Sequence, residues 1–461
     1  MTDGRLKKES VKEGKTVRVA YDGFRLFPTE EKGKLTAAYS ENCSCADGVL
    51  QGGIGYERYL ARDGALVKAA FAESARKFFL LEGWTDGEGT EPKNEYFILN
   101  DDGYIYQYSS VYDGYVKKAN LGANADMVAA IAPDGKTKFV ISGEKGACRV
   151  DGEEWALISE VREGKGAAAI CFSKNRVFLG ELPCKLLYGN PEAPWEFVSS
   201  YDDGGYVYLP LNKGDIVDIA EYGDSVYIFF QRGIMRLKPD GLARNFQISE
   251  TTYFGGEIFG GSVGVCGNWI FFLTENGICR FDGNDAEKVG RFLNVAPMKY
   301  GQKCAHATVG EYFVLQYEDE EAGGTRTVAL RADGKDGYVV SNYVGLNECN
   351  RMPICVVENY FATLRQGGEL PSGAERVFLS ADLELGGVGR KHLKSITLYG
   401  EGCMMLDVLH DWEEKRFEVE DLPLKTTIKV GVTAEQFRLH FVLDKGAKVR
   451  RVVLEYEKID G

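Results

Sequence analysis

The chain has 461 residues, a formal net charge of −14 and 44% hydrophobic residues, so it can bury a sizeable core. The acid excess disfavours binding to the outside of a nucleic-acid duplex or to an anionic membrane surface, because no surplus of lysine and arginine is left to displace counterions. No stretch approaches the roughly 20 apolar residues of a membrane span, and the N-terminus lacks the apolar segment of a secretory signal. We therefore expect the chain to fold in a cytoplasm.

Glycine and cysteine usage narrows the fold further. The 56 glycines and only 12 prolines suit many tight turns between short strands. The 11 cysteines are odd in number, and most lie in apolar runs, where a reduced thiol behaves as a small hydrophobic group. We expect all of them to be free.

The first 55 residues are polar and mixed in charge, with short apolar pieces at 17–21 and 24–27. They predict an N-terminal arm and lead-in segment, 1–55, in which the glycines of 42–56 form tight turns before a first strand at 56–60. Residues 66–76 have helix-forming composition and are the best helix candidate in the chain.

A repeated hairpin organises the middle of the chain. Residues 265–283 predict two strands joined at Asn276-Gly277, and residues 138–152 predict a second copy. Gly146-x-Cys148-Arg149-apolar-Asp151-Gly152 matches Gly277-x-Cys279-Arg280-apolar-Asp282-Gly283 position for position. Looser copies turn at Gly103 and Gly233. The turns are about 40 to 50 residues apart, which is the length of one four-stranded propeller blade.

Weaker copies extend the count. They lie at 177–179 with a turn near Pro183, at 312–315 with a turn near Gly324, and at 360–362 paired with 377–379. The pattern predicts a β-propeller of about seven blades over residues 56–389, with six or eight blades as alternatives.

One unit, residues 171–197, has its own features. Pro191 and Pro194 end a strand, because proline donates no ladder hydrogen bond. Trp195 and Phe197 then fold back as apolar plugs between neighbouring blades. We expect Trp195, Trp269 and Phe281 to pack between blades.

Beyond residue 390 the pattern changes to longer alternating strands, which predict a small C-terminal antiparallel β-sandwich, 390–461. The predicted strands are 393–399, 403–409, 416–419, 427–430, 437–442 and 449–457. The predicted fold class is therefore all-β, with the propeller followed by the sandwich.

No catalytic, cofactor-binding or metal-binding residue is assigned. Gly260-Gly261-Ser262-Val263-Gly264 matches a nucleophile elbow, but an apolar strand follows it where the elbow requires a helix, so a glycine-rich loop is favoured. The four histidines share no metal-ligand spacing, and Cys43-x-Cys45 lacks a second thiol pair for zinc.

Carboxylates gather in glycine-rich turns, where such residues usually bond their own backbone. Asp282, Asn284 and Glu287 could hold Ca²⁺, but their spacing lacks the full ligand series of a dedicated loop, so a turn is favoured. Paired catalytic acids of a propeller glycosidase stay open, because their separation is set by the fold.

Two stretches carry a resemblance to a known family. The chain resembles the packaged-DNA stabilisation, tail-hub or nozzle proteins of short-tailed phages, in a segment Asn…Asp-Gly-x-Leu-x-x-x-x-Gly and in a blade with Arg-apolar-Phe…Leu-Tyr-x-x-Pro-x-x-Pro-x-x-Phe. The matching residues are Asn42, Asp47, Gly48, Leu50, Gly55, Arg176, Val177, Phe178, Leu187, Tyr188, Pro191, Pro194 and Phe197. The resemblance covers roughly residues 42–300. Gly189 stands where the family usually has serine.

The resemblance implies a structural protein of the virion, assembled in the host cytoplasm, and not an enzyme. Copies would form a homo-oligomeric ring at the head-to-tail connector, tail hub or nozzle, in contact with phage connector, adaptor and tail proteins. Packaged DNA would pass without sequence-specific contact, repelled by an acidic lumen, and no cofactor or membrane is implied.

Two other classes stay open. A propeller binding module of a phage tail tip, recognising host-surface glycan, would expose aromatic clusters on one propeller face. A propeller hydrolase or lyase would gather carboxylates or a histidine with shifted pKa values at the central channel.

Overall fold

The computed structural model describes residues 16–26, 33–61, 66–69, 75–84, 93–109, 111–152, 154–198, 204–251, 253, 255–299, 303–383, 385–386 and 389–459. Over these ranges the chain forms β-strands and short 3₁₀ turns and contains no α-helix, which confirms the all-β class. No helix of the described residues is long and apolar enough to span a membrane.

Two compact units emerge from the contacts within the chain. The first unit comprises Met1–Glu57, Thr327–Ser341 and Leu364–Gly461, and the second comprises Arg58–Arg326 and Asn342–Thr363. The division of the chain into 1–55, 56–389 and 390–461 stays a prediction.

The second unit is built from four-stranded antiparallel sheets in which each strand pairs with the next along the chain. The first two sheets contain β7 (Ala75–Trp84), β8 (Lys93–Asn100), β9 (Tyr104–Ser109) and β10 (Gly114–Asn120), then β11 (Asp126–Ile131), β12 (Thr137–Gly143), β13 (Gly146–Asp151) and β14 (Glu154–Leu157). The next two contain β15 (Gly166–Ser173), β16 (Arg176–Glu181), β17 (Lys185–Tyr188) and β18 (Gly205–Tyr208), then β19 (Ile216–Tyr222), β20 (Ser225–Phe230), β21 (Gly233–Lys238) and β22 (Gln247–Glu250).

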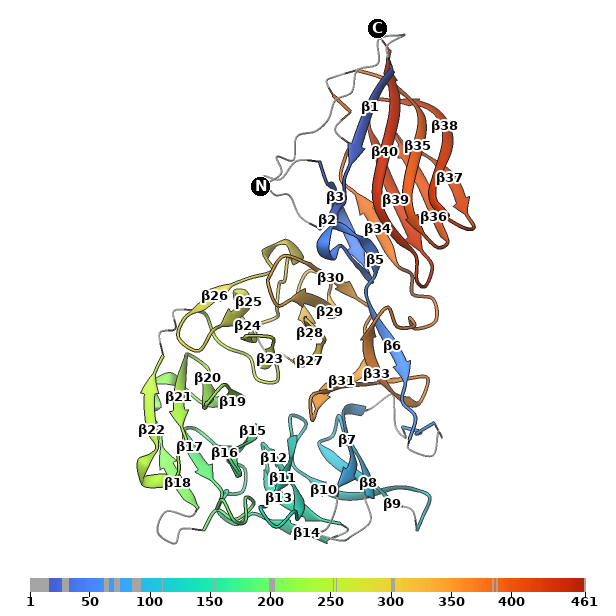
Figure 1. Ribbon diagram of the computed structural model, residues 1–461. Coiled ribbons are helices and arrows are strands. Elements are labelled where there is room, and N and C mark those ends of the chain that lie inside the picture. The colour runs from blue at the N-terminus through green and yellow to red at the C-terminus, as the bar shows by residue number, and fades with distance from the viewer. Residues whose placement is uncertain are drawn as a thin grey trace. The chain divides into compact units, whose positions relative to one another are not determined.

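Later strands continue this order. They are β23 (Gly264–Cys266), β24 (Trp269–Thr274), β25 (Gly277–Phe281) and β26 (Ala286–Lys288), then β27 (Ala305–Val309), β28 (Tyr312–Asp319) and β29 (Gly324–Arg331), then β31 (Val344–Cys349), β32 (Met352–Val357) and β33 (Tyr360–Gln366). Two strands that pair at the ends of these series, β30 (Gly337–Val340) with β29 and β6 (Ile54–Arg58) with β33, fall wholly or almost wholly within the residue ranges of the first unit. The sheets of the second unit follow one another around a ring (Figure 1), and the first strands of successive sheets touch, β15 with β19, β23 with β27 and β31 with β7. This is the organisation of a β-propeller.

The turn glycines occupy equivalent corners, as the repeat predicts. Gly103 lies in the turn between the second and third strands of its sheet, and Gly146, Gly233 and Gly277 are the first residues of the third strands of theirs. The registers agree, since Gly146 pairs with Gly143, Gly233 with Phe230 and Gly277 with Thr274. Gly146 and Gly277 have φ angles of 144° and 110°, a region that favours glycine.

Apolar side chains fill the spaces between adjacent sheets. Trp195 and Phe197 are buried with Val140 and Leu179, between the sheets of β11–β14 and β15–β18, which confirms the predicted plugs. Phe281 is buried against Tyr227 of the preceding sheet, with ring centroids 5.3 Å apart. Trp269 differs from the prediction.

Trp269 begins β24 and is only half-buried. The guanidinium of Arg280 lies over its ring, 4.1 Å from the centroid. The ring of Trp269 therefore contacts β25 of its own sheet. Trp269 is the first residue of β24, and the buried apolar residues follow it in the strand.

The predicted helix at 66–76 is wrong over its described residues. Leu66 and Lys68 form isolated bridges with Leu60 and Tyr360, and Ala75 and Arg76 begin β7. Residues 70–74 lie outside the described ranges. The helix propensity of alanine is weak here, because buried Ala69 and Ala75 pack into the core between sheets.

The predicted pairing of 360–362 with 377–379 is also wrong. β33 pairs with β32 through a turn at Glu358 and Asn359, which have φ angles of 51° and 66°. Two successive positive φ angles are those of a type I′ hairpin turn, here without the usual glycine. β34 (Val377–Ser380) pairs instead in the first unit, with β3 (Leu35–Glu41) and β39.

The first unit contains two groups of strands. One has the order β38-β35-β40-β5-β4, with β1 beside β40, and the other has the order β30-β3-β34-β39-β36-β37, with β2 beside β3. The remaining bounds are β1 (Thr16–Tyr21), β2 (Phe24–Arg25), β4 (Cys43–Ser44), β5 (Leu50–Gly52), β35 (Lys391–Glu401), β36 (Met404–His410), β37 (Glu413–Val419), β38 (Leu424–Ala434), β39 (Phe437–Leu443) and β40 (Lys448–Lys458).

A single hydrophobic cluster draws buried side chains from both groups of strands, among them Ile396 and Val452 from one and Leu406 and Phe441 from the other. The six strands predicted after residue 390 are confirmed. The described part of 1–55, which the sequence suggested to be an arm, also supplies strands to this unit. β1, for example, pairs along its whole length with β40.

Candidate functional site

The blade motif of the resemblance forms a loop, which we call the clasp (Arg176 with 189–197), and Arg176, Pro194, Trp195 and Phe197 in it are buried. Arg176, the first residue of β16, is 1% exposed. Its guanidinium donates hydrogen bonds to the carbonyl oxygens of Gly189, at 2.6 Å, and Gly241, at 3.3 Å, and lies over the ring of Phe246. The clasp therefore has a structural role.

Backbone packing inside the clasp explains its glycine. The N–H of Gly189 donates to the carbonyl of Val177 at 2.8 Å, and the N–H of Val177 donates to the carbonyl of Pro194 at 3.4 Å. A Cβ atom at Gly189 would overlap the Pro194 carbonyl oxygen. The serine usual in the resembled family does not fit this loop as it stands.

The N-terminal motif is equally structural. Asn42 is buried in the first unit, where its Oδ1 accepts from the backbone N–H of Ser341 at 2.8 Å and its Nδ2 donates to the carbonyl of Glu375 at 2.9 Å. A Cβ at Gly55 would overlap the carbonyl oxygen of Glu369. In both stretches that carry the resemblance, buried polar groups thus bond to the chain's own backbone.

The chemical motifs of the sequence are structural as well. Ser262 is buried, donates to the carbonyl of Phe259 and accepts from the N–H of Leu273, and strand β23 follows it. Asp282 forms a turn, because its Oδ1 accepts the N–H groups of Asn284 and Asp285, both at 2.8 Å. Glu287 pairs with Arg280. The turn interpretation is therefore confirmed for Asp282.

The cysteines are all free, as predicted, and most are buried. Burial raises the pKa of Cys43 and Cys45 well above the ordinary thiol value, so both stay protonated and are poor metal ligands. Among the described residues no group of three or more histidine, cysteine, aspartate and glutamate side chains could hold a metal ion.

Polar side chains line two hollows in the second unit. The larger has a volume of about 350 Å³ and the smaller about 250 Å³, and both are lined by Arg76, Lys77 and Cys304. The larger hollow is also lined by Asp101, Lys303, Gln316, Glu318, Thr325 and 342–345. The smaller is also lined by Asn124, Glu144, 166–168, 215–217, Gln231 and 260–261. Most of these residues lie at or next to the first strands of the sheets.

β-Bulges direct side chains into the hollows. In β7 the pairing with β8 shifts between Ala75 and Lys77, so Arg76 is an extra residue. Consecutive side chains of a regular strand face opposite sides, whereas here both Arg76 and Lys77 line the hollows. The pairing of β19 shifts in the same way around Val217, which lines the smaller hollow.

Arg76 has no hydrogen bond or ion pair to any residue in the described part of the chain. Burial lowers the pKa of its guanidinium, while the charges of Asp101 and Glu144 act in the opposite direction from a distance. The adjacent Lys77 is paired, with its Nζ 3.5 Å from Asp126. The hollows therefore contain one satisfied cation and one unsatisfied cation from the same strand.

Asp218 is buried behind the wall of the smaller hollow. Its Oδ1 accepts the N–H of Ile219 at 2.9 Å and its Oδ2 accepts the N–H of Gly261 at 3.2 Å. Burial, and then the negative charge of Asp126, raise the pKa of Asp218 to about 7. Cys304 stays a thiol, because burial raises its pKa as well.

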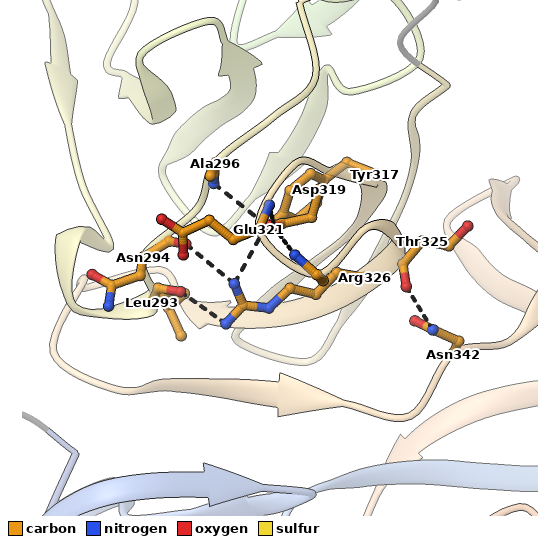
Figure 2. Close-up of polar contacts among 10 residues, drawn as sticks. Leu293, Asn294, Ala296, Tyr317, Asp319, Glu321, Thr325, Arg326 and Asn342 are labelled. Atoms are coloured by element: carbon orange, nitrogen blue, oxygen red, sulfur yellow. Dashed lines mark hydrogen bonds and ion pairs between the residues drawn. The ribbon is translucent and has the colours of Figure 1, made fainter.

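A hydrogen-bond network fixes one wall of the larger hollow. Figure 2 shows buried Asp319, at the end of β28, accepting from the N–H of Glu321 at 3.0 Å and from the guanidinium of Arg326 at 3.4 Å. Arg326 also donates to the carbonyls of Leu293 and Asn294. This network anchors the hairpin of β28 and β29, which supplies Gln316, Glu318 and Thr325 to the hollow.

Exposed aromatic side chains form one small cluster on the outer strand β18. Tyr206 and Tyr208 are 54% and 66% exposed, and their rings meet edge to face with centroids 5.5 Å apart. Neither tyrosine belongs to a motif that the sequence shows. The signal was present in the alternation Gly205-Tyr206-Val207-Tyr208, which places both rings on one side of the strand.

The second unit thus defines an all-β protein of the propeller type, with polar hollows next to its first strands. No family model matches the chain, and no curated protein matches it by sequence. Similar solved structures include an ancestral GH74 enzyme, with 10% identity, a TM-score of 0.40 and coverage of 73% of this chain and 54% of that one. The match therefore spans about half the length of that enzyme.

Two further structures are similar at the same level. A mitotic checkpoint complex matches with 7% identity and a TM-score of 0.38, over 67% of this chain and 96% of that one. BBS1N in complex with ARL6DN matches with 9% identity and a TM-score of 0.40, over 67% and 98%.

Proposed function

We propose that this chain is a structural protein of a tailed-phage virion, which forms a homo-oligomeric ring at the head-to-tail connector, tail hub or nozzle. In this proposal the propeller has about seven blades, with β6 completing the last, and the first unit is an antiparallel β-sandwich. The ring retains and conducts the packaged genome and binds connector, adaptor and tail proteins.

The clasp is the observation that carries the proposal. Its residues are those of the resemblance, and the guanidinium of Arg176 donates hydrogen bonds to carbonyl groups of the same chain. A motif that stabilises the fold by internal hydrogen bonds is expected in a structural protein that must keep its shape under mechanical stress. The net charge of −14 fits a channel that repels the DNA backbone.

The proposal includes the absence of enzymatic activity. Asp218 has a shifted pKa, but both of its oxygens accept backbone N–H groups. Among the histidines, His306 donates to the carbonyl of Gly261, whereas His440 bonds Asp407 in the first unit. A hydrolase or lyase would place such groups together around one open site.

A second function is favoured by the tyrosine pair of β18. Exposed aromatic rings stack on sugars, so Tyr206 and Tyr208 would suit a tail-tip module that binds host-surface glycan. The same pair would suit a subunit contact in the ring. These two functions predict different losses when the rings are removed.

The test measures the mass of the full chain in solution, alone and with a candidate connector ring, by native mass spectrometry. The expected result is a ring or a complex with the connector. The double variant Tyr206→Ser/Tyr208→Ser is tested for ring formation and for binding to host-cell glycan. The control in both measurements is Tyr112→Ser, which removes a tyrosine that is 76% exposed in a turn. A strictly monomeric chain that joins no ring, and whose binding to host-cell glycan is lost only in the double variant, would overturn the virion-ring proposal.

A further inference from the structure

We propose that the larger of the two hollows lined by Arg76 binds a small hydroxylated monocarboxylate, of the sugar-acid class, through the guanidinium of Arg76. This inference is independent of the proposed function, because it depends only on the residues that line the hollow.

Arg76 has no hydrogen-bond or ion-pair partner among the described residues. The bulge in β7 places its guanidinium in the hollow beside Lys77, yet no described carboxylate lies within ion-pair distance of Arg76. Partly buried guanidinium groups usually pair with carboxylates, carbonyls or phosphates, since desolvation otherwise goes uncompensated. Arg176 and Arg326 in the same unit show that pattern. Arg76 is the exception that an external anion would complete.

The side chains around the hollow indicate the charge of that anion. The guanidinium presents a planar pair of donors that matches a carboxylate in a bidentate arrangement. Arg76, Lys77 and Lys303 line this hollow together with two carboxylates, those of Asp101 and Glu318. The lining therefore has a net charge of +1, which one negative charge on the ligand balances. A monoanion is therefore favoured over a phosphate dianion.

The volume and the polar walls of the hollow indicate what the rest of the ligand is. The hollow of about 350 Å³ lies at the small end of the usual range of ligand sites, roughly 300 to 1,000 Å³. Beyond Arg76, Lys77 and Lys303 its walls carry carboxylate, amide and hydroxyl groups. Glu318, Asn342 and Thr325 among them are held by the hairpin of β28 and β29. Oxygen-rich walls of this kind accept hydrogen bonds from ligand hydroxyls.

The Asp319 network supports a preformed site. Because Asp319 is buried and ties the turn between β28 and β29 to the 293–296 segment, Glu318 and Thr325 are held in place before a ligand arrives. Preformed sites lose less conformational entropy on binding.

The test titrates the full chain with D-glucuronate by isothermal titration calorimetry and ligand-observed NMR, with D-glucose and inorganic phosphate as comparisons. Glucuronate should bind more tightly than either. Arg76→Met should lower its affinity by at least about tenfold, as expected for loss of a charge-assisted bidentate contact. The matched control is Arg450→Met, since Arg450 is an exposed arginine that pairs with Glu401 and does not line the hollow.

A thermal melt of each variant accompanies the titrations. If Arg76→Met does not fold, Arg76→Lys answers the question, because lysine keeps the charge and loses the planar fork; it should weaken glucuronate binding several-fold. No binding of glucuronate, equal binding by Arg76→Met or by Arg76→Lys, or tighter binding of phosphate than of glucuronate would each overturn the proposal.

Discussion

Two arginines of the second unit, 100 positions apart in the chain, illustrate two uses of a buried charge. Arg176 in the clasp is 1% exposed and donates to carbonyl oxygens of two different loops. Arg76 in the hollows is partly buried and has no hydrogen-bond partner among the described residues. The local backbone differs as well, since Arg176 begins a regular strand and Arg76 occupies a bulge.

The hydrogen-bond partners of a buried arginine can therefore distinguish a structural role from a ligand-binding role. A buried guanidinium that is satisfied within the fold contributes to stability, and its removal leaves polar groups without partners. One that is left unsatisfied contributes little to stability and is available to a ligand. Sequence motifs drew attention to Arg176, whereas the geometry draws attention to Arg76.

The largest effect should come from Arg176→Met. Methionine fills much of the space but leaves the buried carbonyl of Gly189 without its donor, so the free energy of unfolding should fall by about 3 to 4 kcal/mol. Urea denaturation measures this change. Arg236→Met is the control, because Arg236 pairs with the exposed Asp224, and its loss should cost less than about 1 kcal/mol. Equal losses in the two variants would contradict a structural role for the clasp.

A smaller loss is expected from Gly189→Ser, which installs the residue usual in the resembled family. Its Cβ would overlap the carbonyl oxygen of Pro194, so the clasp must shift, at a cost of about 2 to 3 kcal/mol in the free energy of unfolding. Gly324→Ala is the matched control, because a Cβ there meets no atom within 4 Å and the free energy should change by less than about 0.5 kcal/mol. A neutral Gly189→Ser variant would mean that the loop adapts at no cost.

The repeat could be predicted because its signals are local. Gly146 and Gly277 stand at turns where φ is positive, and the apolar runs before them form the buried second strands of their sheets. The plug at Trp195 followed from the two prolines nearby. These features depend on a few neighbouring residues, so a single sequence reveals them.

The hollows could not be predicted, because they depend on register. Arg76 lies in a stretch of helix-forming composition, and nothing in that stretch marks a bulge in β7. Asp218 and Asp126 come from different sheets, and the charge of Asp126 acts on Asp218 only because the fold arranges those sheets in a ring. The turn at Glu358 and Asn359 was missed for a local reason, since its positive φ angles occur without glycine.

The pH dependence of stability tests the second unusual charge near the hollows. The pKa of Asp218 is about 7 in the folded chain and about 3.9 in an unfolded one, so the folded state binds an extra proton between these values. Stability contributed by this group is present in full below about pH 4 and is lost as the pH rises through about 7, with a slope of at most about 1.4 kcal/mol per pH unit.

Asp218→Asn should remove that slope, as measured by urea denaturation from pH 4.5 to 8, whatever its effect on the absolute stability. The exposed turn residue Asp285 provides the control, and Asp285→Asn should keep the slope of the original chain. A slope that survives in Asp218→Asn would assign the titration to another group.

The smallest effect on stability should come from Arg76→Met. Its loss in the free energy of unfolding should be much smaller than that of Arg176→Met. The substitution removes no hydrogen bond to a described residue, and it relieves the desolvation that lowers the pKa of the guanidinium. It also removes the attraction of Asp101 and Glu144, which acts over a longer distance. The two changes oppose each other, so the free energy of unfolding should change by less than about 1 kcal/mol in urea denaturation. A loss as large as that of Arg176→Met would show that Arg76 has a structural partner and is not held in reserve for a ligand.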